Sequence, residues 1–176
     1  PARYSFPACL LDFSQIVRQG RQVIMFGGDV PCFYYHLLLP EWMWPYFTVP
    51  GISAAMLAVA ADKSLYQNLY EVDLTGDITN LPTGYAAIIS AGTFTHGHLG
   101  PEPLRHLIRH CQSGGVFCIG VNQQHYDTHD FALCLRSLVA DNVITSPDLL
   151  ETAIYARKSD KHSGDLALIC QFRVVG

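Results

Sequence analysis

The amino-acid sequence predicts a doubly wound α/β fold, in which helices cover both faces of a mostly parallel seven-stranded sheet that ends in an antiparallel β-hairpin. Short apolar runs alternate with segments of helix-like apolar spacing, and this alternation is typical of βαβ units. The last two apolar runs are separated only by a polar segment, residues 158–165, which predicts a loop. A length of 176 residues suits one domain, residues 1–176, that buries a full core without disulfides or metals.

The strands are expected at the apolar runs, which are residues 22–26, 46–49, 69–74, 86–91, 115–121, 152–157 and 166–174. Helices are expected where apolar residues recur every three or four positions, at residues 30–39, 54–63, 101–111 and 129–140. Asp29 and Ser53 precede two of these helices. We predict both as N-caps, because their side chains can accept a hydrogen bond from the first helical turn.

The composition excludes several classes of protein. Hydrophobic residues make up 49% and charged residues 15%, which argues against disorder, and the apolar runs are far shorter than the ~20 residues of a membrane-spanning helix. The net charge of -4 and the lack of a basic stripe give no reason to expect nucleic-acid binding. The six Cys residues form no CxxC pair, and residues 1–11 lack the features of a signal peptide, so we expect a cytoplasmic protein.

Three segments have sequence motifs that are informative about the family. Residues 51–65, GISAAMLAVAADKSL, read as a strand end followed by a helix that opens with Ser-x-x-Met-Leu. Residues 85–100, YAAIISAGTFTHGHLG, read as a strand with its exit loop, and residues 111–122, CQSGGVFCIGVN, read as a Gly-Gly turn with a strand. In these segments and in its layout the chain resembles the class I, Rossmann-like, S-adenosylmethionine-dependent methyltransferases, and within them the small Williams-Beuren-region methyltransferase-like branch.

The resemblance implies S-adenosylmethionine as cofactor and a small molecule as methyl acceptor. The family has an acidic residue and then Gly-x-Gly-x-Gly after the first strand, whereas here Met25 stands at the acid position. Gly51 stands where the family has a carboxylate that binds the ribose hydroxyls, and Ala86 replaces a third acid. The cofactor motifs are therefore degenerate. The positions implied for cofactor contacts are Gly27, Gly28, Asp29, Gly51, Ile52, Asp73, Leu74 and Ala91.

Asp73 and Asp77 follow the third predicted strand and have two interpretations. The family often places a residue against the adenine at this point of the chain. Asp is also favoured in turns and caps, because its side chain accepts hydrogen bonds from nearby backbone N–H groups. The local interpretation is the stronger of the two for both residues, and for Asp29 as well.

The loop that follows the fourth predicted strand is the best candidate for chemistry. It leaves the carboxyl end of that strand, which is the edge where open α/β sheets bind ligands. Methyl transfer needs a positioned acceptor and, when the acceptor carries a proton, a base such as histidine. Thr95, His96 and His98 are therefore the candidate catalytic residues. The competing interpretation is that the two histidines are solvated loop residues near the next helix.

No metal site is expected, although His106 and His110 follow the loop at helical spacing, because these spacings match no zinc signature. We expect this pair on the solvent face of its helix. Three functions remain open: a methyltransferase that acts on a small molecule, a non-catalytic protein of the same fold that serves as a binding or assembly module with lost or weak cofactor binding, and a binder of another nucleotide. The last is disfavoured because Gly51 offers a ribose no carboxylate.

Overall fold

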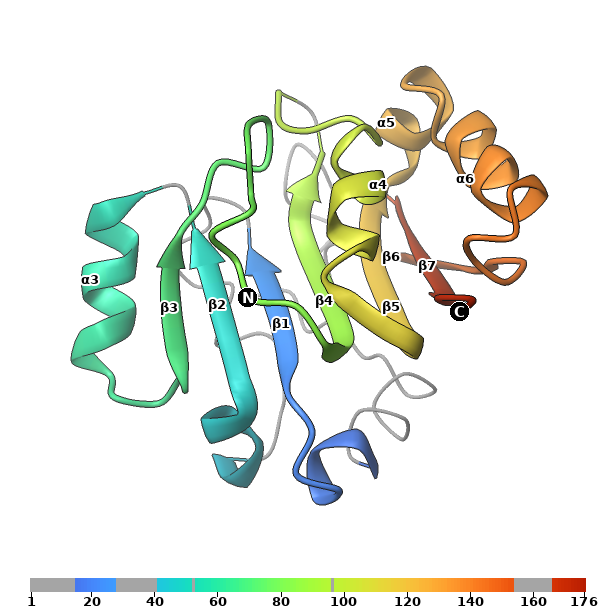
Figure 1. The fold of residues 1–176 in the computed structure, drawn as a ribbon. Helices are drawn as coiled ribbons and strands as arrows, with labels where there is room; N and C mark the ends of the chain where they lie inside the picture. The colour runs from blue at the N-terminus through green and yellow to red at the C-terminus, as the bar shows by residue number, and fades with distance from the viewer. Residues whose placement is uncertain (1–14, 28–40, 52, 96, 154–165) are drawn as a thin grey trace.

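The computed structural model describes residues 15–27, 41–51, 53–95, 97–153 and 166–176. Its centre is a seven-stranded sheet with the strand order β3-β2-β1-β4-β5-β7-β6 (Figure 1). The strands are β1 (Val23–Gly27), β2 (Phe47–Gly51), β3 (Asn68–Glu71), β4 (Tyr85–Phe94), β5 (Cys111–Asn122), β6 (Asp148–Ala153) and β7 (Leu166–Arg173). β1 to β5 pair in parallel, and β7 pairs antiparallel with β5 and β6. The predicted sheet, with its C-terminal antiparallel pair, is confirmed.

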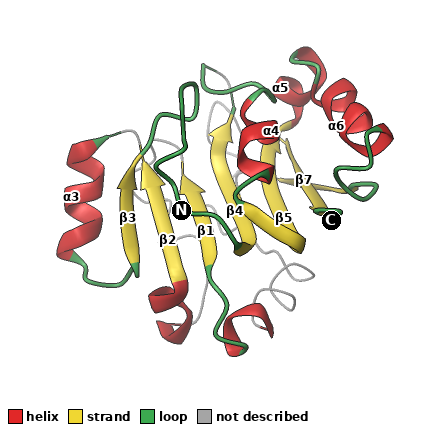
Figure 2. Ribbon diagram, viewed as in Figure 1, coloured by secondary structure: helices red, strands yellow, loops and turns green. Residues whose placement is uncertain are grey.

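Helices lie on both faces of the sheet (Figure 2). On one face, α4 (Pro103–Ile108), α5 (Gln123–Thr128) and α6 (Phe131–Ala140) contribute Leu104, Tyr126 and Leu135 to a core cluster that includes Ile88 of β4. On the other face, Ile16, Val17 and Met43 pack with Met25 of β1, and Met43 belongs to a short 3₁₀ helix, η1 (Glu41–Tyr46). α3 (Ala54–Asp62) lies beside β3 and β2. None of the described helices is both long and apolar enough to cross a membrane.

Two strand ends differ from the prediction in ways that affect the carboxyl edge. β3 stops at Glu71, not at residue 74, because the chain then turns where the Asp73 carboxylate accepts a hydrogen bond from the Thr75 N–H group (2.9 Å). β4 continues to Phe94 rather than ending at residue 91, and its register with β5 shifts between Ser90 and Phe94. Gly92, inside the shift, has a φ of 76° that favours glycine. Thr95 therefore follows β4 directly.

Other boundaries in the second half were also wrong by several residues. β5 begins at Cys111 instead of residue 115, and β6 occupies Asp148–Ala153 instead of residues 152–157, of which 154–157 lie outside the described residues. β6 is an edge strand whose leucines are half exposed, so its position depends on pairing with β7 more than on apolar pattern. α6 begins at Phe131 rather than at residue 129, because Asp130 is left-handed (φ 55°) and cannot continue a helix.

The helix starts are otherwise close to the prediction where they can be compared. The N-cap of α3 is confirmed, since Ser53 Oγ accepts a hydrogen bond from the Met56 N–H group (3.4 Å). α4 is shorter than predicted at both ends, and neither η1 nor α5 was predicted. The helix expected at residues 30–39, with Asp29 as its N-cap, lies outside the described residues.

Candidate functional site

The carboxyl ends of β1, β2 and β4 lie side by side, because β1 pairs in parallel with both neighbours. Gly27 ends β1 and is in register with Ala91 of β4. Gly51 ends β2 and is in register with Glu71, which ends β3. The backbone of three predicted cofactor positions therefore meets at one edge of the sheet.

Three further predicted cofactor positions, Gly28, Asp29 and Ile52, lie outside the described residues. Met25, at the position where the family has an acid, is fully buried on the face of the sheet that also holds Val49. Phe26 is buried on the opposite face. Neither side chain offers a polar group at this edge. The part of β1 that could contact a ligand at the edge is therefore the backbone of Gly27.

Asp73 and Asp77 organise the exposed loop after β3. The carboxylate of Asp73 accepts hydrogen bonds from the hydroxyl (2.7 Å) and the N–H group (2.9 Å) of Thr75, and these bonds lower the pKa of Asp73. Asp77 accepts from the N–H group of Thr79 (2.9 Å), which lowers its pKa in the same way. The turn interpretation is confirmed for both residues. Leu74, between them in the chain, is partly buried against the core.

A closed turn follows β4. The N–H group of His98 donates to the carbonyl of Thr95 (3.0 Å), and the N–H group of Leu99 donates to the carbonyl of Thr93 (3.3 Å). Gly97 has a φ of 76°, a left-handed conformation that glycine adopts without strain. Thr95 is half-buried and His98 is exposed, so the turn presents both near the carboxyl end of β4. The third catalytic candidate, His96, lies outside the described residues.

His125, which the sequence did not single out, contacts this turn. Asn122, the last residue of β5, caps α5 by accepting the N–H group of His125 (3.1 Å). The His125 side chain is 1% exposed, and its Nε2 lies 2.9 Å from the carbonyl oxygen of Leu99. Because a carbonyl oxygen only accepts, Nε2 carries the proton and donates it. The sequence signal for this arrangement was the Asn122 N-cap, but a six-residue helix shows too little periodicity to predict.

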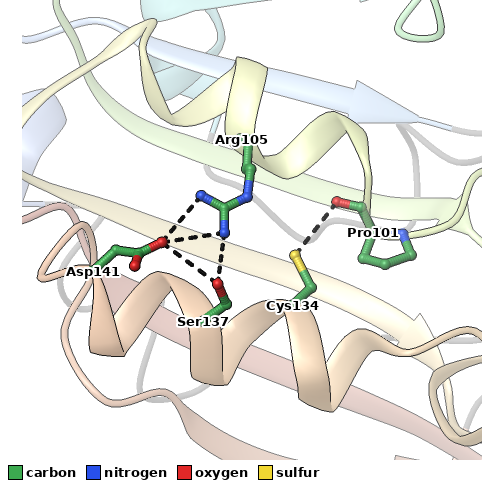
Figure 3. Close-up of polar contacts among 5 residues, drawn as sticks. All are labelled: Pro101, Arg105, Cys134, Ser137 and Asp141. Atoms are coloured by element: carbon green, nitrogen blue, oxygen red, sulfur yellow. Dashed lines mark hydrogen bonds and ion pairs between the residues drawn. The ribbon is translucent and has the colours of Figure 1, made fainter.

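The chain just after the turn is also tied to α6 (Figure 3). The thiol of Cys134 donates to the carbonyl of Pro101 (3.9 Å), and burial raises the pKa of this thiol. Further along the chain, the guanidinium of Arg105 on α4 contacts the hydroxyl of Ser137 on α6 (2.8 Å) and the carboxylate of Asp141, which follows α6 (3.3 Å). α4 and α6 are thus joined by polar contacts next to the segment that leaves the turn.

The expected solvent position is wrong for His110 and right for His106. His110 is 6% exposed, and its Nδ1 donates to the carbonyl of Pro82 (3.0 Å). Its own carbonyl accepts the N–H group of Tyr85, at the amino end of β4 and therefore at the opposite edge from the candidate site. His106 is exposed. Within the described ranges no group of three or more His, Cys, Asp or Glu side chains is arranged to hold a metal ion.

Comparisons with known proteins support the fold but not a family assignment. No family model matches the chain, and no curated protein matches its sequence. An S-adenosylmethionine-dependent O-methyltransferase from Thermotoga maritima, at 12% identity, matches 100% of this chain and 68% of its own with a TM-score of 0.60. An S-adenosylmethionine-dependent methyltransferase from Clostridium acetobutylicum, at 13% identity, matches 94% of this chain and 90% of its own with a TM-score of 0.56. The chain has the class I methyltransferase fold.

A third solved structure with this methyltransferase fold contains a cofactor product. The N-methyltransferase NodS from Bradyrhizobium japonicum WM9, in complex with S-adenosyl-l-homocysteine, has 14% identity and matches 93% of this chain and 86% of its own, with a TM-score of 0.54. These comparisons confirm the fold that the sequence resemblance implied. Membership of the Williams-Beuren-region branch stays a prediction.

The glycines at the carboxyl edge of the sheet suit the nucleoside part of S-adenosylmethionine, whereas the lack of a carboxylate at position 51 differs from the class I methyltransferases. Gly27 and Gly51 end their strands, and a glycine has no Cβ atom between its backbone and a ligand. Glu71 and Asp73 are exposed carboxylates at the end of the neighbouring strand. Position 51 itself supplies no carboxylate, so a ribose would lose its charge-assisted hydrogen bonds there.

Proposed function

We propose that the chain is an S-adenosylmethionine-dependent methyltransferase that acts on a small molecule in the cytoplasm. The observation that carries the proposal is the meeting of Gly27, Gly51 and Ala91 at one carboxyl edge, in the strand order of the class I methyltransferase fold. A turn with two candidate catalytic residues, Thr95 and His98, leaves the same edge. Ligands of open α/β sheets bind at this edge.

The residues of the edge divide into two groups by their place in the sheet. The proposed cofactor positions are Gly27, Gly28 and Asp29 after β1, Gly51 and Ile52 after β2, Asp73 and Leu74 after β3, and Ala91 in β4. When bound, S-adenosylmethionine supplies an electrophilic methyl group. The turn after β4 then forms the acceptor side, because β4 lies next to β1 and away from β3.

The acceptor side has the groups that methyl transfer requires of the protein. The reaction needs the acceptor atom to be aligned with the methyl group, and positioning alone contributes much of the rate. Thr95 and His98 carry a hydroxyl and an imidazole that can hydrogen-bond a polar acceptor. Either His96 or His98 can take the proton of an acceptor hydroxyl or amine as the new bond forms.

Isothermal titration calorimetry with S-adenosylmethionine and S-adenosylhomocysteine tests the cofactor part of the proposal. We expect weak, saturable binding of both, because the fold keeps the edge while Gly51 lacks the ribose carboxylate. No binding at millimolar ligand would overturn the proposal and favour the non-catalytic module.

The acceptor part is tested by transfer of isotope-labelled methyl groups from S-adenosylmethionine to a small-molecule extract, followed by mass spectrometry. His98→Ala is expected to lower the transfer and leave the affinity for S-adenosylhomocysteine unchanged. His106→Ala is the matched control, because it removes an exposed histidine from α4. Equal transfer by the His98 variant and the control would show that His98 has no part in the reaction.

A further inference from the structure

The turn after β4 is held at its base by a residue from another part of the chain. Leu99 closes the turn with its N–H group, which donates to the carbonyl of Thr93 (3.3 Å). The carbonyl of the same residue accepts from Nε2 of His125 on α5 (2.9 Å). Both backbone groups of Leu99 are therefore engaged, one by β4 and the other by α5.

His125 is itself held in place by its surroundings. Its backbone N–H group is bound by the Asn122 side chain at the end of β5, and its ring centroid lies 3.9 Å from that of His129 and 5.6 Å from that of Phe131. Phe131 packs edge-on against Phe94, the last residue of β4, with ring centroids 5.8 Å apart. The imidazole is thus packed against His129 and Phe131, and Phe131 connects it to the end of β4.

The hydrogen bond between His125 Nε2 and the Leu99 carbonyl restricts where that carbonyl can lie. The buried partner is the ring of His125: if the contact broke, its Nε2–H group would lose the Leu99 carbonyl as acceptor, and leaving a buried donor unsatisfied costs more than the net gain from making one hydrogen bond. The ring has little freedom to turn away, because its backbone N–H group is bound by Asn122 and the rings of His129 and Phe131 pack against it. The carbonyl of Leu99 consequently has one favourable position, and it fixes the end of the turn.

We propose that His125 is a positioning residue, which through the carbonyl of Leu99 holds the turn carrying Thr95 and His98 at the carboxyl edge of the sheet. That this turn is the acceptor side rests on the proposed methyltransferase function. The His125 side chain is buried and its Nε2 donates to the Leu99 carbonyl, so it acts through Leu99 and not by direct contact with a ligand. A general packing role would not require a donor at the place of Nε2.

Two amide variants separate the positioning role from packing. In His125→Gln the side-chain NH₂ group is at the distance of Nε2 and can donate to Leu99, whereas in His125→Asn it is one bond shorter and cannot reach. Hydrogen exchange of the His98 and Leu99 amides, measured by NMR against the amides of Ile88 and Ile119 in the central strands, reports the order of the turn. We expect exchange in the Asn variant to rise about tenfold over the wild type and the Gln variant to stay within about threefold.

Equal exchange in the Gln and Asn variants, or an unchanged turn in a folded Asn variant, would overturn the proposal. If the Asn variant does not fold, the nitrogen chemical shifts of the His125 ring in the wild type decide instead. A proton on Nε2 supports the donor role, and an unprotonated Nε2 refutes it. Calorimetry with S-adenosylhomocysteine on the wild type tests the proposed methyltransferase function separately from the role of His125. Absence of binding would overturn the proposed function, while the exchange data would still test whether His125 positions the turn.

Discussion

One substitution, Gly51→Asp, would give the end of β2 the carboxylate that the class I methyltransferases have at this place and that the proposed function calls for. Gly51 is a strand residue in register with Glu71, so the backbone there is extended and accepts an L-amino acid. An Asp at this position would place a carboxylate where the family binds the ribose hydroxyls. We expect the variant to bind S-adenosylhomocysteine more tightly than the wild type does.

The expected gain is set by the new contact with the ligand. A charge-assisted hydrogen bond to the ribose contributes roughly 1.5 to 3 kcal/mol, which is about ten- to a hundredfold in affinity. The new carboxylate would also be next to Glu71 on the adjacent strand, and two charges about 5 Å apart in water repel by about 0.8 kcal/mol. This repulsion is the same with and without ligand, so it lowers the stability of the folded variant and not its affinity. The double variant Gly51→Asp/Glu71→Gln should therefore be more stable than Gly51→Asp and bind with a similar affinity.

Calorimetry at pH 7 and low salt measures these affinities, with Gly51→Asn as the uncharged control of the same shape. The Asn variant should gain less than the Asp variant, because a neutral hydrogen bond is weaker. An Asp variant that is folded and binds no better than the wild type would refute the reasoning, and would indicate that position 51 does not face the ribose.

Tight, low-micromolar binding by the wild type would also contradict this reasoning, since another group would then replace the missing carboxylate. Asp73 and Asp77 already accept hydrogen bonds through Oδ1 in their own turns, so a ligand contact by either would use its second carboxylate oxygen. Glu71, in register with Gly51, would be the group to test. In that case Glu71→Gln weakens binding, whereas under the first expectation it does not.

Three further predictions concern the described side chains. Asp73→Asn should lower the free energy of unfolding above roughly pH 4, and this loss should shrink as the pH is lowered further. The reason is that a carboxyl with a lowered pKa stabilises the fold above its ordinary pKa and loses this effect as the pH falls through the folded value. Urea melts over a series of pH values measure the loss, and an equal loss at every pH would contradict the prediction. Arg105→Ala should lower the free energy of unfolding by less than about 1 kcal/mol, and by less still in 1 M salt, since the ion pair of Arg105 with Asp141 is half exposed. Arg109→Ala is the control, and a larger, salt-independent loss in the Arg105 variant would contradict the prediction. Burial raises the pKa of the Cys111 and Cys170 thiols to about 12, so iodoacetamide at pH 8 should label them only after the protein unfolds. Peptide mass spectrometry measures the labelling, and rapid labelling of the native protein would contradict the prediction.

The sequence by itself determined the fold class and several of the residues that end the parallel strands at their carboxyl edge. The apolar runs of β1, β4 and β5 are long and bounded by turn residues, and their burial on both faces of a parallel sheet makes them readable without tertiary information. The place of Gly51 at the end of β2 also followed from the chain, since Ser53 marks the start of the next helix. The start of that helix is set by a local hydrogen bond, from the Met56 N–H group to Ser53 Oγ.

Tertiary structure decided the elements whose stability comes from distant partners. β6 lies at an edge and is defined by its pairing with β7, and β4 extends past its apolar run because β5 continues beside it. His110 is buried because the carbonyl of Pro82, distant in the chain, supplies an acceptor. His125 could not be predicted for the same reason: an imidazole is buried when a partner satisfies it, and its partner, the carbonyl of Leu99, comes from a different strand's exit turn and reaches it only in the folded chain.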